Sequence, residues 1–421
     1  MADIPRYMRD VIPPESERFA EVERIGASIV ELAGYRRIIT PMFENTDTFT
    51  RGVGESTDIV NKEMYTFDDR SGHSLTLRPE GTAPVVRSIV TNHLDQGGLP
   101  VKLYYSAPMF RYEKPQKGRY RQHHQIGIEA IGSEDPALDV EVLATGWNVL
   151  AACGVEATLL LNSMGHPGED CRKRYQPALK EFLEGYREQL DADCKRRMDQ
   201  NPLRVFDCKV PADQAILANA PLLEDFLCAS CREHLGDVQR GLKELGIPYT
   251  MAPRLVRGFD YYTRTTFEYQ SAALDAAQNA VGGGGRYDGL VESLGGPGLP
   301  GIGFGLGIER IRLAQEAAGV QLPSHEVTVL VVPVGAEEKD AATSLLWSLR
   351  AAGVRSDTTY SERSLKAQLK HANRIGARLV AIIGANERAA GTCTLRRMDS
   401  GEQTELIVSD AVARAAEEQA R

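Results

Sequence analysis

Two polar side chains on one predicted strand could hold a small ligand. In the segment HHQIGIEAIG, the period of two along a strand puts Gln125 and Glu129 on one face, with Gly127 between them and mostly apolar residues on the opposite face. An amide and a carboxylate separated by a gap without a side chain form a floor for a small polar ligand. The alternative is an exposed strand face whose polar groups are solvated.

An arginine and a basic loop precede this strand. Arg111 ends the segment VKLYYSAPMFR, on a mostly apolar face. Its planar guanidinium suits a carboxylate or a phosphate, although an arginine at a strand end can also extend into solvent. The loop that joins the two segments has one acid, Glu113, and four bases, which are Lys114, Lys117, Arg119 and Arg121. This charge predicts an anionic partner, with a merely solvated loop as the alternative.

A strand rich in glycine offers a second kind of surface. GIGFGLGIER has glycine at every second position from Gly301 to Gly307, with apolar residues between them. One face is therefore core and the other is bare backbone, on which a flat ligand such as a purine can lie. Arg310, in the first turn of the following helix, would meet the phosphates of such a ligand. A tightly packed glycine strand is the alternative, and the pattern excludes a Walker A loop and the G-x-G-x-x-G loop.

A further arginine precedes a group of aromatic residues. In LVRGFDYYTRTTFEYQ, Arg257 comes shortly before Tyr261 and Tyr262. The mixture is unusual for a core strand, although half-buried tyrosines with a polar tip would also explain it. We expect this segment to resume the strand pattern.

The elements that must position these residues follow from hydrophobic periodicity. VKLYYSAPMFRYE and HHQIGIEAIG, from Val101 to Gly132, alternate as the two arms of a long antiparallel hairpin. Residues 15–33 and 83–94 have helical spacing. GYRRIITPMFE predicts a short strand that ends at Pro41.

Two later regions have a sequence pattern different from that of this sheet. From Gly165 to Gly246 the sequence is charged and helical, which predicts an insertion. A loop around 322–325 leads to a region in which strands alternate with helices, as in a small α/β domain.

One helix of this last region has a basic face. In SERSLKAQLKHANRIGA, basic residues recur every three or four positions, namely Arg363, Lys366, Lys370 and Arg374. Between Arg350 and Arg397 there are ten basic and three acidic residues, a local charge of +7, whereas the whole chain carries −9. A solvated face is the alternative, but the local charge favours an RNA partner.

The composition places the chain among globular proteins. It has 421 residues, of which 42% are hydrophobic and 25% charged, enough for two or three domains with proper cores. No stretch approaches the length of a membrane span, and the N-terminus does not resemble a signal peptide, so we expect a cytoplasmic protein that contacts no membrane.

Seven cysteines are too few for a disulfide scaffold in a chain of this length, and they predict reduced thiols. CASCREH, with Cys228, Cys231 and His234, could form a zinc site together with Cys208 upstream. Scattered thiols are the commoner explanation, so we predict no metal there.

Taken together, these segments resemble the class II aminoacyl-tRNA synthetases, and specifically the histidine-specific family. GYRRIITPMFE is similar to the first motif of the class, FRYEKPQKGRYRQ to the second and GIGFGLGIER to the third. LRPEGT, QIGIE, LVRGFDYY and GGGGRYDGL are similar to the elements specific for histidine, and the resemblance covers nearly the whole chain.

The resemblance implies an α/β protein with an α+β catalytic domain, built on the antiparallel sheet of class II synthetases with helices on its flanks. It places this catalytic domain at residues 1–322, a helical insertion within it at 165–250, and an anticodon-binding α/β domain at 325–421. It also implies a homodimer, with Pro41 at the interface.

Residue roles carried over from the family are expectations about the site. The α-amino group of histidine would be held by Gln125 and by the LRPEGT turn, which contributes Glu80, Gly81 and Thr82. Glu129 and Tyr262 would bracket its imidazole, and Tyr261 would lie nearby. Arg111 and Arg257 would flank the histidine carboxylate and the α-phosphate of ATP. Glu113 and Arg310 would lie at the ATP. The loop residues Lys117, Arg119 and Arg121 would meet the acceptor end of the tRNA.

The implied reaction joins L-histidine to tRNA(His) in two steps, through a histidyl-adenylate, with ATP and Mg²⁺. Two non-catalytic alternatives are a histidine-sensing regulatory paralogue of histidine biosynthesis and a tRNA-sensing pseudo-synthetase. Such paralogues generally lack the anticodon domain or the ATP-facing arginines, and this chain keeps both. At the N-terminus the family usually has glycine in an Arg-Gly-x-x-Asp turn, where this chain has Tyr7 in RYMRD.

Overall fold

The computed structural model describes residues 3–54, 57, 59–113, 118–166, 171–275, 279–320, 327–360 and 363–420. The chain divides into two compact units, Met1–Gln321 and Leu322–Arg421. Among the described residues, no helix has both the length and the apolar composition needed to span a bilayer.

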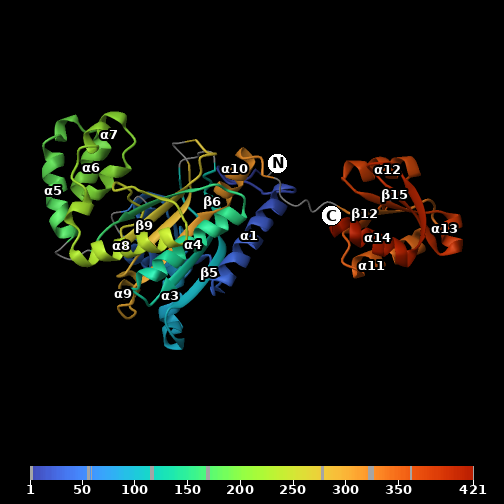
Figure 1. The fold of residues 1–421 in the computed structure, drawn as a ribbon, viewed down its shortest axis with the longest axis horizontal. Coiled ribbons are helices and arrows are strands. Elements are labelled where there is room, and N and C mark those ends of the chain that lie inside the picture. Colours follow the sequence, from blue (N-terminus) through green and yellow to red (C-terminus); the bar gives the residue numbers. More distant parts are fainter. Residues whose placement is uncertain are drawn as a thin grey trace. The chain divides into compact units, whose positions relative to one another are not determined.

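The first unit is built on an eight-stranded sheet with the order β1-β5-β6-β11-β10-β9-β7-β8 (Figure 1). Its strands are β1 (Arg36–Arg37), β5 (Val101–Phe110), β6 (Gln122–Ile131), β7 (Thr158–Ser163), β8 (Tyr249–Met251), β9 (Thr263–Gln270), β10 (Ala280–Arg286) and β11 (Gly301–Gly307). The six strands from β5 to β7 in this order pair antiparallel, and the two edge strands pair parallel. The predicted antiparallel sheet is thus confirmed, with a parallel strand added at each edge.

The predicted hairpin is the pair β5 and β6, and the predicted division of its faces is correct. Ile126, Ile128 and Ala130 are fully buried in the core on one side of the sheet. Helices α1 (Glu15–Leu32), α4 (Pro136–Ala152) and α10 (Ile308–Ala317) supply the other half of this core. The opposite face packs against α3 (Thr82–Thr91) and α9 (Leu290–Ser293) and carries the polar residues of the candidate site.

The segment GYRRIITPMFE differs from the prediction, because it contributes to two sheets rather than forming one strand. β1 joins the large sheet, whereas β2 (Phe43–Asn45) belongs to a small sheet with β4 (Ser74–Leu77) and β3 (Tyr65–Asp68). Arg78 crosses the break between β1 and β2, donating from Nη1 to the carbonyl oxygens of Thr40 at 2.9 Å and Pro41 at 3.3 Å. Helix α2 (Thr46–Val53) follows β2.

Residues between β7 and β8 form a helical region, as the sequence predicts. Its helices are α5 (Arg172–Glu184), α6 (Ala192–Gln200), α7 (Pro211–Leu217) and α8 (Ala229–Glu244). They enclose a separate apolar core. Tyr262, directly before β9 of the large sheet, is part of this core. Helix α8 also reaches the main core through Val238 and Leu242.

A buried polar network anchors α8 to the sheet. Asp139 of α4 accepts hydrogen bonds at Oδ2 from Thr265 Oγ1 at 2.6 Å and lies 2.6 Å from His234 Nε2 of α8. Its other oxygen lies 2.6 Å from Arg286 Nη2, and both side chains of this ion pair are fully buried. One carboxylate thus joins four elements, α4, α8, β9 and β10.

We expect Asp139→Ala to lower the free energy of unfolding by about 3–5 kcal/mol, because the buried Arg286 would lose its fully buried partner and keep only the partly exposed Asp288 at 3.3 Å. Urea denaturation followed by far-UV circular dichroism measures this change. Asp135→Ala is the matched control on the same helix: Asp135 caps α4 by accepting from the Ala137 amide at 2.9 Å, and its loss should cost only about 1 kcal/mol. Equal costs for the two variants would show that the network contributes little.

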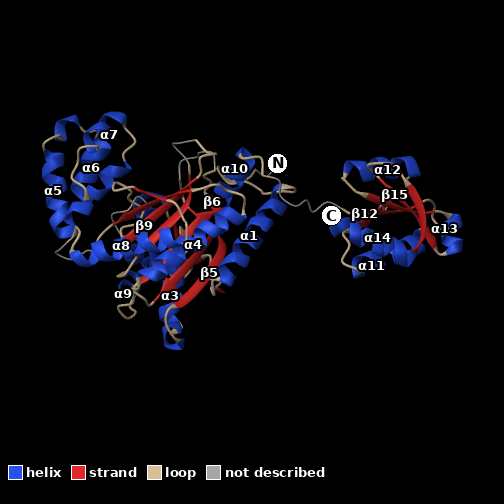
Figure 2. Ribbon diagram, viewed as in Figure 1, coloured by secondary structure: helices blue, strands red, loops and turns tan. Residues whose placement is uncertain are grey.

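The second unit is a five-stranded sheet with helices on both faces (Figure 2). Its elements are β12 (Val329–Pro333), α11 (Lys339–Ala351), β13 (Ser356–Thr358), α12 (Leu365–Arg374), β14 (Leu379–Ile383), α13 (Ala385–Ala390), β15 (Thr392–Arg397), β16 (Gln403–Ile407) and α14 (Val408–Ala420). Alternate residues of β12 are buried against α11 and α14 on one face and against α12 on the other, so the strand is apolar throughout. The predicted alternation of strands and helices is confirmed, while the predicted loop at 322–325 lies outside the described residues.

Candidate active site

A cavity of about 590 Å³ opens on the polar face of the large sheet. Most of the site residues predicted for the first unit line it: Glu80, Gly81, Thr82, Arg111, Glu113, Arg119, Gln125, Arg257, Tyr261, Tyr262 and Arg310. They come from the turn before α3, the hairpin, the segment before β9 and the start of α10. Elements far apart in the sequence thus place their polar side chains around one space.

Glu129 lies beneath this cavity rather than on its wall, and only 1% of it is exposed. Its carboxylate accepts a hydrogen bond from Thr82 Oγ1 at 2.7 Å and another from the Tyr287 hydroxyl. Burial raises the pKa of Glu129 to about 8, although both hydrogen bonds favour the ionised form. At neutral pH this carboxyl group is therefore poised to gain or lose a proton.

Glu80 is a second buried carboxylate at the same place. It accepts from the backbone amides of Thr82 at 2.5 Å and Ala83 at 2.9 Å, and so satisfies the first turn of α3. Burial raises its pKa as well. Two carboxyl groups that burial makes reluctant to ionise would both be stabilised in their charged form by a positively charged ligand.

The gap at Gly127 is not the open floor that the strand pattern predicts. The strand register puts Tyr105 of β5 directly opposite Gly127. A Cβ atom on Gly127 would lie 2.4 Å from the Tyr105 ring, and one on Gly81 only 2.2 Å from it. The aromatic ring therefore fills the space that the two glycines leave, and its edge lines the cavity.

The segment LVRGFDYY is also not a strand, since β9 begins only at Thr263. The residues before it form an aromatic cluster instead: Tyr261 stacks on Phe259, with ring centroids 5.1 Å apart, and lies 4.8 Å from the Tyr262 ring. Tyr261 also meets the Tyr287 ring edge-on. Burial raises the pKa of Tyr261 and Tyr262, so both keep their phenolic protons as hydrogen-bond donors.

Arg257 reaches the cavity from this same segment. Its Nη1 atom lies 2.5 Å from Glu268 Oε2, an acid on β9. A Cβ atom on Gly283 would lie 3.0 Å from the guanidinium carbon, so this glycine of β10 lets the arginine lie against the sheet. Glu268 fixes the position of the guanidinium, and Arg257 lines the cavity.

A second group of arginines surrounds Glu113. Arg111 Nη1 lies 3.7 Å from one oxygen of Glu113, and Arg119 Nη1 lies 3.4 Å from the other. Arg111 also donates from Nε to the Pro79 carbonyl at 2.7 Å, which fixes its stem. Burial and the charge of Arg119 lower the pKa of Arg310, which lies against Gly118 of the same loop. Positive charges thus crowd one part of the cavity, and an anionic ligand would relieve their repulsion.

The face of bare glycines on β11 is only partly open. The space over Gly303 is occupied by the Glu129 carboxylate, and the space over Gly301 by the Tyr287 ring. Gly303, Gly305 and Gly307 all line the cavity, together with Gly282 and Gly283 of β10, but of these three β11 glycines only Gly305 and Gly307 are partly exposed. Half of the pattern thus allows close packing within the protein, and the other half leaves backbone exposed to a ligand.

A cavity with two buried acids and several tyrosines beside a group of arginines suits a ligand that combines a cationic or polar part with anionic groups. The family model for histidyl-tRNA synthetase matches residues 7–311. The chain belongs to this family. A second model, described as anticodon binding domain, matches residues 328–418.

Relatives and solved structures agree with this assignment. The chain is 50% identical to the histidine–tRNA ligase of Moorella thermoacetica over 410 residues, which are 97% of this chain and 96% of the relative. It is 48% identical to that of Saccharopolyspora erythraea over 413 residues, 97% of each chain. The crystal structure of S. aureus histidyl-tRNA synthetase is 38% identical, covers 99% of this chain and 100% of its own, and superposes with a TM-score of 0.82.

The loop of the second motif is described only in part, and Lys117 lies outside the described residues. Arg119 is exposed. Arg121 instead packs within the protein, with its guanidinium carbon 3.6 Å from the centre of the Tyr112 ring and 4.9 Å from that of Tyr7. The loop can therefore offer Arg119 to a partner more freely than Arg121.

Tyr7 keeps the turn in which this synthetase family usually has glycine. Its φ is +65°, a left-handed conformation that L residues with a side chain rarely adopt. The Tyr7 carbonyl accepts from the Arg121 amide at 3.1 Å, and its ring meets the Arg121 guanidinium. These contacts offset the cost of the conformation, so the departure from the family pattern leaves the turn intact.

In the anticodon-binding domain, the four predicted basic residues are all exposed: Lys366, Lys370 and Arg374 lie on α12, while Arg363 precedes the helix. The opposite side of this helix, with Leu365, Leu369 and Ala372, packs against the sheet. The predicted amphipathic arrangement is correct.

Three contributors to the site are missing from the sequence-based prediction. Tyr287 holds Glu129, and Tyr105 fills the gap at Gly127. Glu268 fixes Arg257. Tyr287 stands within the motif GGGGRYDGL, which was a signal for it. Nothing in the sequence marks the other two, because their roles depend on the strand register.

The four metal ligands considered from the sequence do not form one group. His234 lies beside Asp139, and Cys208 donates from its thiol to Asp213 at 3.3 Å. Cys228 and Cys231 have other neighbours, described below.

Proposed function

We propose that this chain joins L-histidine to tRNA(His) through a histidyl-adenylate, with release of pyrophosphate and AMP. The observation that carries the proposal is one cavity in which buried acids and tyrosines adjoin a group of arginines. Histidine offers a cationic amine and an imidazole to the first group, and its carboxylate and the phosphates of ATP to the second.

In the first step an oxygen of the histidine carboxylate attacks the α-phosphorus of ATP, and the bond to the β-phosphate oxygen breaks. Arg257 and Arg111 would flank the reacting groups and stabilise the negative charge that develops on the phosphorus oxygens. Arg310 would hold the polyphosphate, which leaves as pyrophosphate. No nucleophile of the protein is required, so catalysis rests on position and charge.

Recognition of the amino acid would fall to the buried acids and their neighbours. Glu80, Thr82 and Gln125 would hold the α-amino group, with Gly81 in the same turn, while Glu129 and Tyr262 read the imidazole and Tyr261 closes the pocket. An imidazole has one donor and one acceptor, so an analogue that lacks either leaves a buried polar group unpaired.

ATP would enter as its Mg²⁺ complex. Glu113, between Arg111 and Arg119, is the carboxylate of this part of the cavity, and carboxylate oxygens are ligands that Mg²⁺ prefers. The exposed Arg119 and the rest of the second-motif loop, including Lys117 and Arg121, would meet the acceptor end of the tRNA in the second step. There the 3′-terminal ribose hydroxyl attacks the histidyl carbonyl, and AMP leaves.

The non-catalytic alternatives are not favoured. The anticodon-binding domain is present, and the relatives named histidine–tRNA ligase align over nearly the whole chain. Histidine-dependent ATP–pyrophosphate exchange tests the proposal: a histidine sensor binds the amino acid without exchange, and this result would refute the catalytic assignment.

We expect the affinity for tRNA(His) to fall steeply with salt, because basic residues of α12 would meet phosphates. Lys370→Ala should weaken tRNA binding and reduce the slope of log Kd against log[salt] by about one. Lys339→Ala on α11, which packs on the other face of the domain's sheet, is the matched control. Fluorescence anisotropy over a salt series measures both, and an affinity insensitive to salt would contradict the assignment.

The assembly and location of the protein complete the proposal. We infer a class II homodimer that pairs near Pro41, because Ile39, Met42 and Phe43 leave 81%, 54% and 49% of their surface exposed there. None of the seven cysteines forms a disulfide, which supports a reducing, cytoplasmic location.

A further inference from the structure

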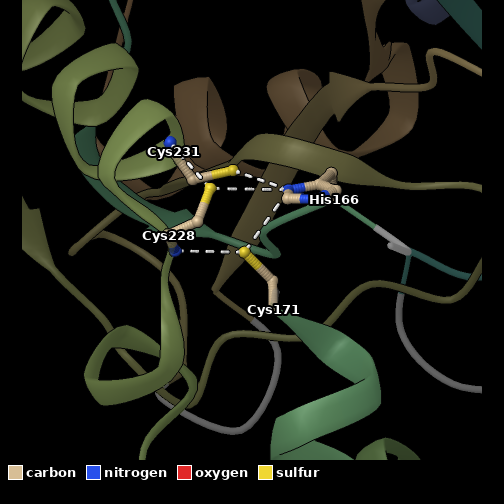
Figure 3. A group of neighbouring side chains, drawn as sticks. All are labelled: His166, Cys171, Cys228 and Cys231. Atoms are coloured by element: carbon tan, nitrogen blue, oxygen red, sulfur yellow. Dashed lines mark hydrogen bonds between the residues drawn. The ribbon is translucent and has the colours of Figure 1, made fainter. Parts of the chain in front are cut away.

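Four potential metal ligands meet where the helical insertion leaves and rejoins the sheet. His166 follows β7, Cys171 immediately precedes α5, and Cys228 and Cys231 lie at the start of α8. Figure 3 shows the three sulfur atoms and the imidazole pointing toward one another from these separate segments. The ligand atoms all lie within 4.8 Å of one another.

The distances in this cluster match the edges of a small tetrahedron. His166 Nδ1 lies 3.2 Å from Cys231 Sγ, 3.4 Å from Cys171 Sγ and 3.7 Å from Cys228 Sγ. Zinc bonds of about 2.3 Å to sulfur and about 2.0–2.1 Å to nitrogen in tetrahedral geometry require nitrogen–sulfur edges of about 3.5 Å. One ion at the centre would reach all four atoms with little movement.

The surroundings favour thiolates at Cys171 and Cys228, whereas burial raises the pKa of the Cys231 thiol. The amide of Cys228 donates to Cys171 Sγ at 3.3 Å, and the amide of Cys231 donates to Cys228 Sγ at 3.4 Å. Cys228 is also the N-cap of α8, where the helix dipole stabilises negative charge. Cys171 and Cys231 are buried, while Cys228 and His166 are partly exposed, so an ion could enter from one side.

We propose that His166, Cys171, Cys228 and Cys231 bind one Zn²⁺ ion as a structural site. Three sulfurs and one imidazole fill the four positions of tetrahedral zinc and leave none for a substrate, as is usual for structural sites. The cluster is separate from the residues assigned to histidine, ATP and tRNA, so the inference goes beyond the proposed function and is independent of it.

The ion would fasten the base of the insertion beside the histidine pocket. Arg172, next to Cys171, donates from Nε to the Met164 carbonyl at 3.0 Å and from Nη2 to the Tyr262 carbonyl. The amide of Arg264 donates to Gly165 at 2.7 Å, directly before His166. Zinc would thus link α5 and α8 to the backbone that carries Tyr262, and would add a further closure to the long segment between His166 and Cys228.

A second group of polar side chains in the insertion provides an internal comparison. Asp191, Cys194, Cys208 and Asp213 also lie within 4.8 Å of one another. Their atoms already serve the local structure: Asp191 caps α6 by accepting from the Cys194 amide at 2.6 Å, and Asp213 accepts from the Cys208 thiol at 3.3 Å and from the Asp191 amide at 3.3 Å. We therefore place the metal at the cluster around His166.

Metal analysis of the untagged full chain, purified under reducing conditions without chelator, tests the site. We expect about one zinc per chain in the wild type. Cobalt added to the chelator-treated protein should give the visible bands of tetrahedral Co²⁺ and sulfur-to-cobalt charge-transfer bands in the near ultraviolet. Cys228→Ser and His166→Ala should lose most of the zinc, whereas the matched control Cys194→Ser should keep it. Zinc should also raise the Tm of the chelator-treated wild type.

Two results would overturn the proposal. The first is a wild type that holds less than about a tenth of an ion per chain after zinc reconstitution and gives no tetrahedral cobalt spectrum. The second is zinc that Cys194→Ser loses and the other two variants keep. The wild-type measurements stand even if a variant fails to fold, and ATP–pyrophosphate exchange measured on the same samples separates this inference from the proposed function.

Discussion

Replacing Arg257 with alanine should lower the rate of histidine-dependent ATP–pyrophosphate exchange by about 10²–10³-fold, equivalent to about 2.7–4 kcal/mol of transition-state stabilisation. The dissociation constant of histidine should change little. Arg257 lies on the wall of the cavity, fixed by Glu268 at 2.5 Å, so its charge is already in place when the phosphorus gains negative charge. An interaction made mainly in the transition state affects the rate and not substrate binding.

Two further variants make the result interpretable. Arg257→Ala leaves the half-buried Glu268 without its partner, so the free energy of unfolding must be measured alongside the rate. Arg257→Lys keeps a positive charge for Glu268 but loses the planar guanidinium with its paired donors. We expect this variant to fold stably but to catalyse the exchange slowly. Arg240→Ala, an exposed arginine of α8 paired with Asp237 at 2.7 Å, should behave as wild type. Equal losses in exchange rate and histidine affinity for Arg257→Ala would remove its assignment to the transition state.

The sequence predicted those parts of the site that depend on local periodicity. The two faces of β6, the alternation of glycines on β11 and the basic face of α12 all follow from the repeat of a strand or a helix, and tertiary contacts decide only how much of each face stays open. Periodicity also placed Arg310 correctly in the first turn of α10. These features are fixed by spacing along one segment.

What could not be predicted depends on contacts between segments. Tyr105 fills the gap at Gly127 only because the hairpin register brings these two residues opposite each other, and a loop of uncertain length hides that register. The metal ligands show the same limit: Cys228 and Cys231 were recognisable by their spacing, but their partners His166 and Cys171 lie about 60 positions earlier in the chain. His234, a neighbour in sequence, turns instead to the buried Asp139. An unpaired buried carboxylate is costly, so pairing His234 with Asp139 stabilises the fold.

Replacing Glu129 with glutamine should weaken histidine binding by about 10- to 100-fold, because the imidazole would lose a hydrogen bond to a buried carboxyl group. Glutamine has nearly the same volume, and its single carbonyl oxygen can still accept from Thr82 or Tyr287. The rate of exchange at saturating histidine should change less than the affinity. Isothermal titration calorimetry gives the affinity, and Asp95→Asn, at a partly exposed position beyond α3, is a charge-matched control.

The pH dependence of this variant is a sharper test than its affinity. Burial raises the pKa of Glu129 to about 8 in the free protein, and a free imidazole has a pKa of about 6.5. One proton shared between the carboxyl and the imidazole forms the contact. Below pH ~6.5 both partners carry a proton and one must be released, while above pH ~8 neither does and one must be taken up. The affinity of the wild type should therefore fall on both sides of this window, and Glu129→Gln should lose the alkaline limb.

Protein stability should show the same ionisation with a defined sign. The folded protein holds the Glu129 proton more tightly than the unfolded chain, so this group favours folding below its ordinary pKa of 4.5, and the benefit is lost as the pH rises to about 8. The difference in Tm, Glu129→Gln minus wild type, should thus become more positive over this range. In the binding measurement, ionisation of the histidine amine affects the wild type and Glu129→Gln alike. The difference between their pH profiles of affinity therefore reports on Glu129. Parallel profiles in both binding and Tm would mean that Glu129 does not titrate near neutral pH and does not share a proton with the substrate.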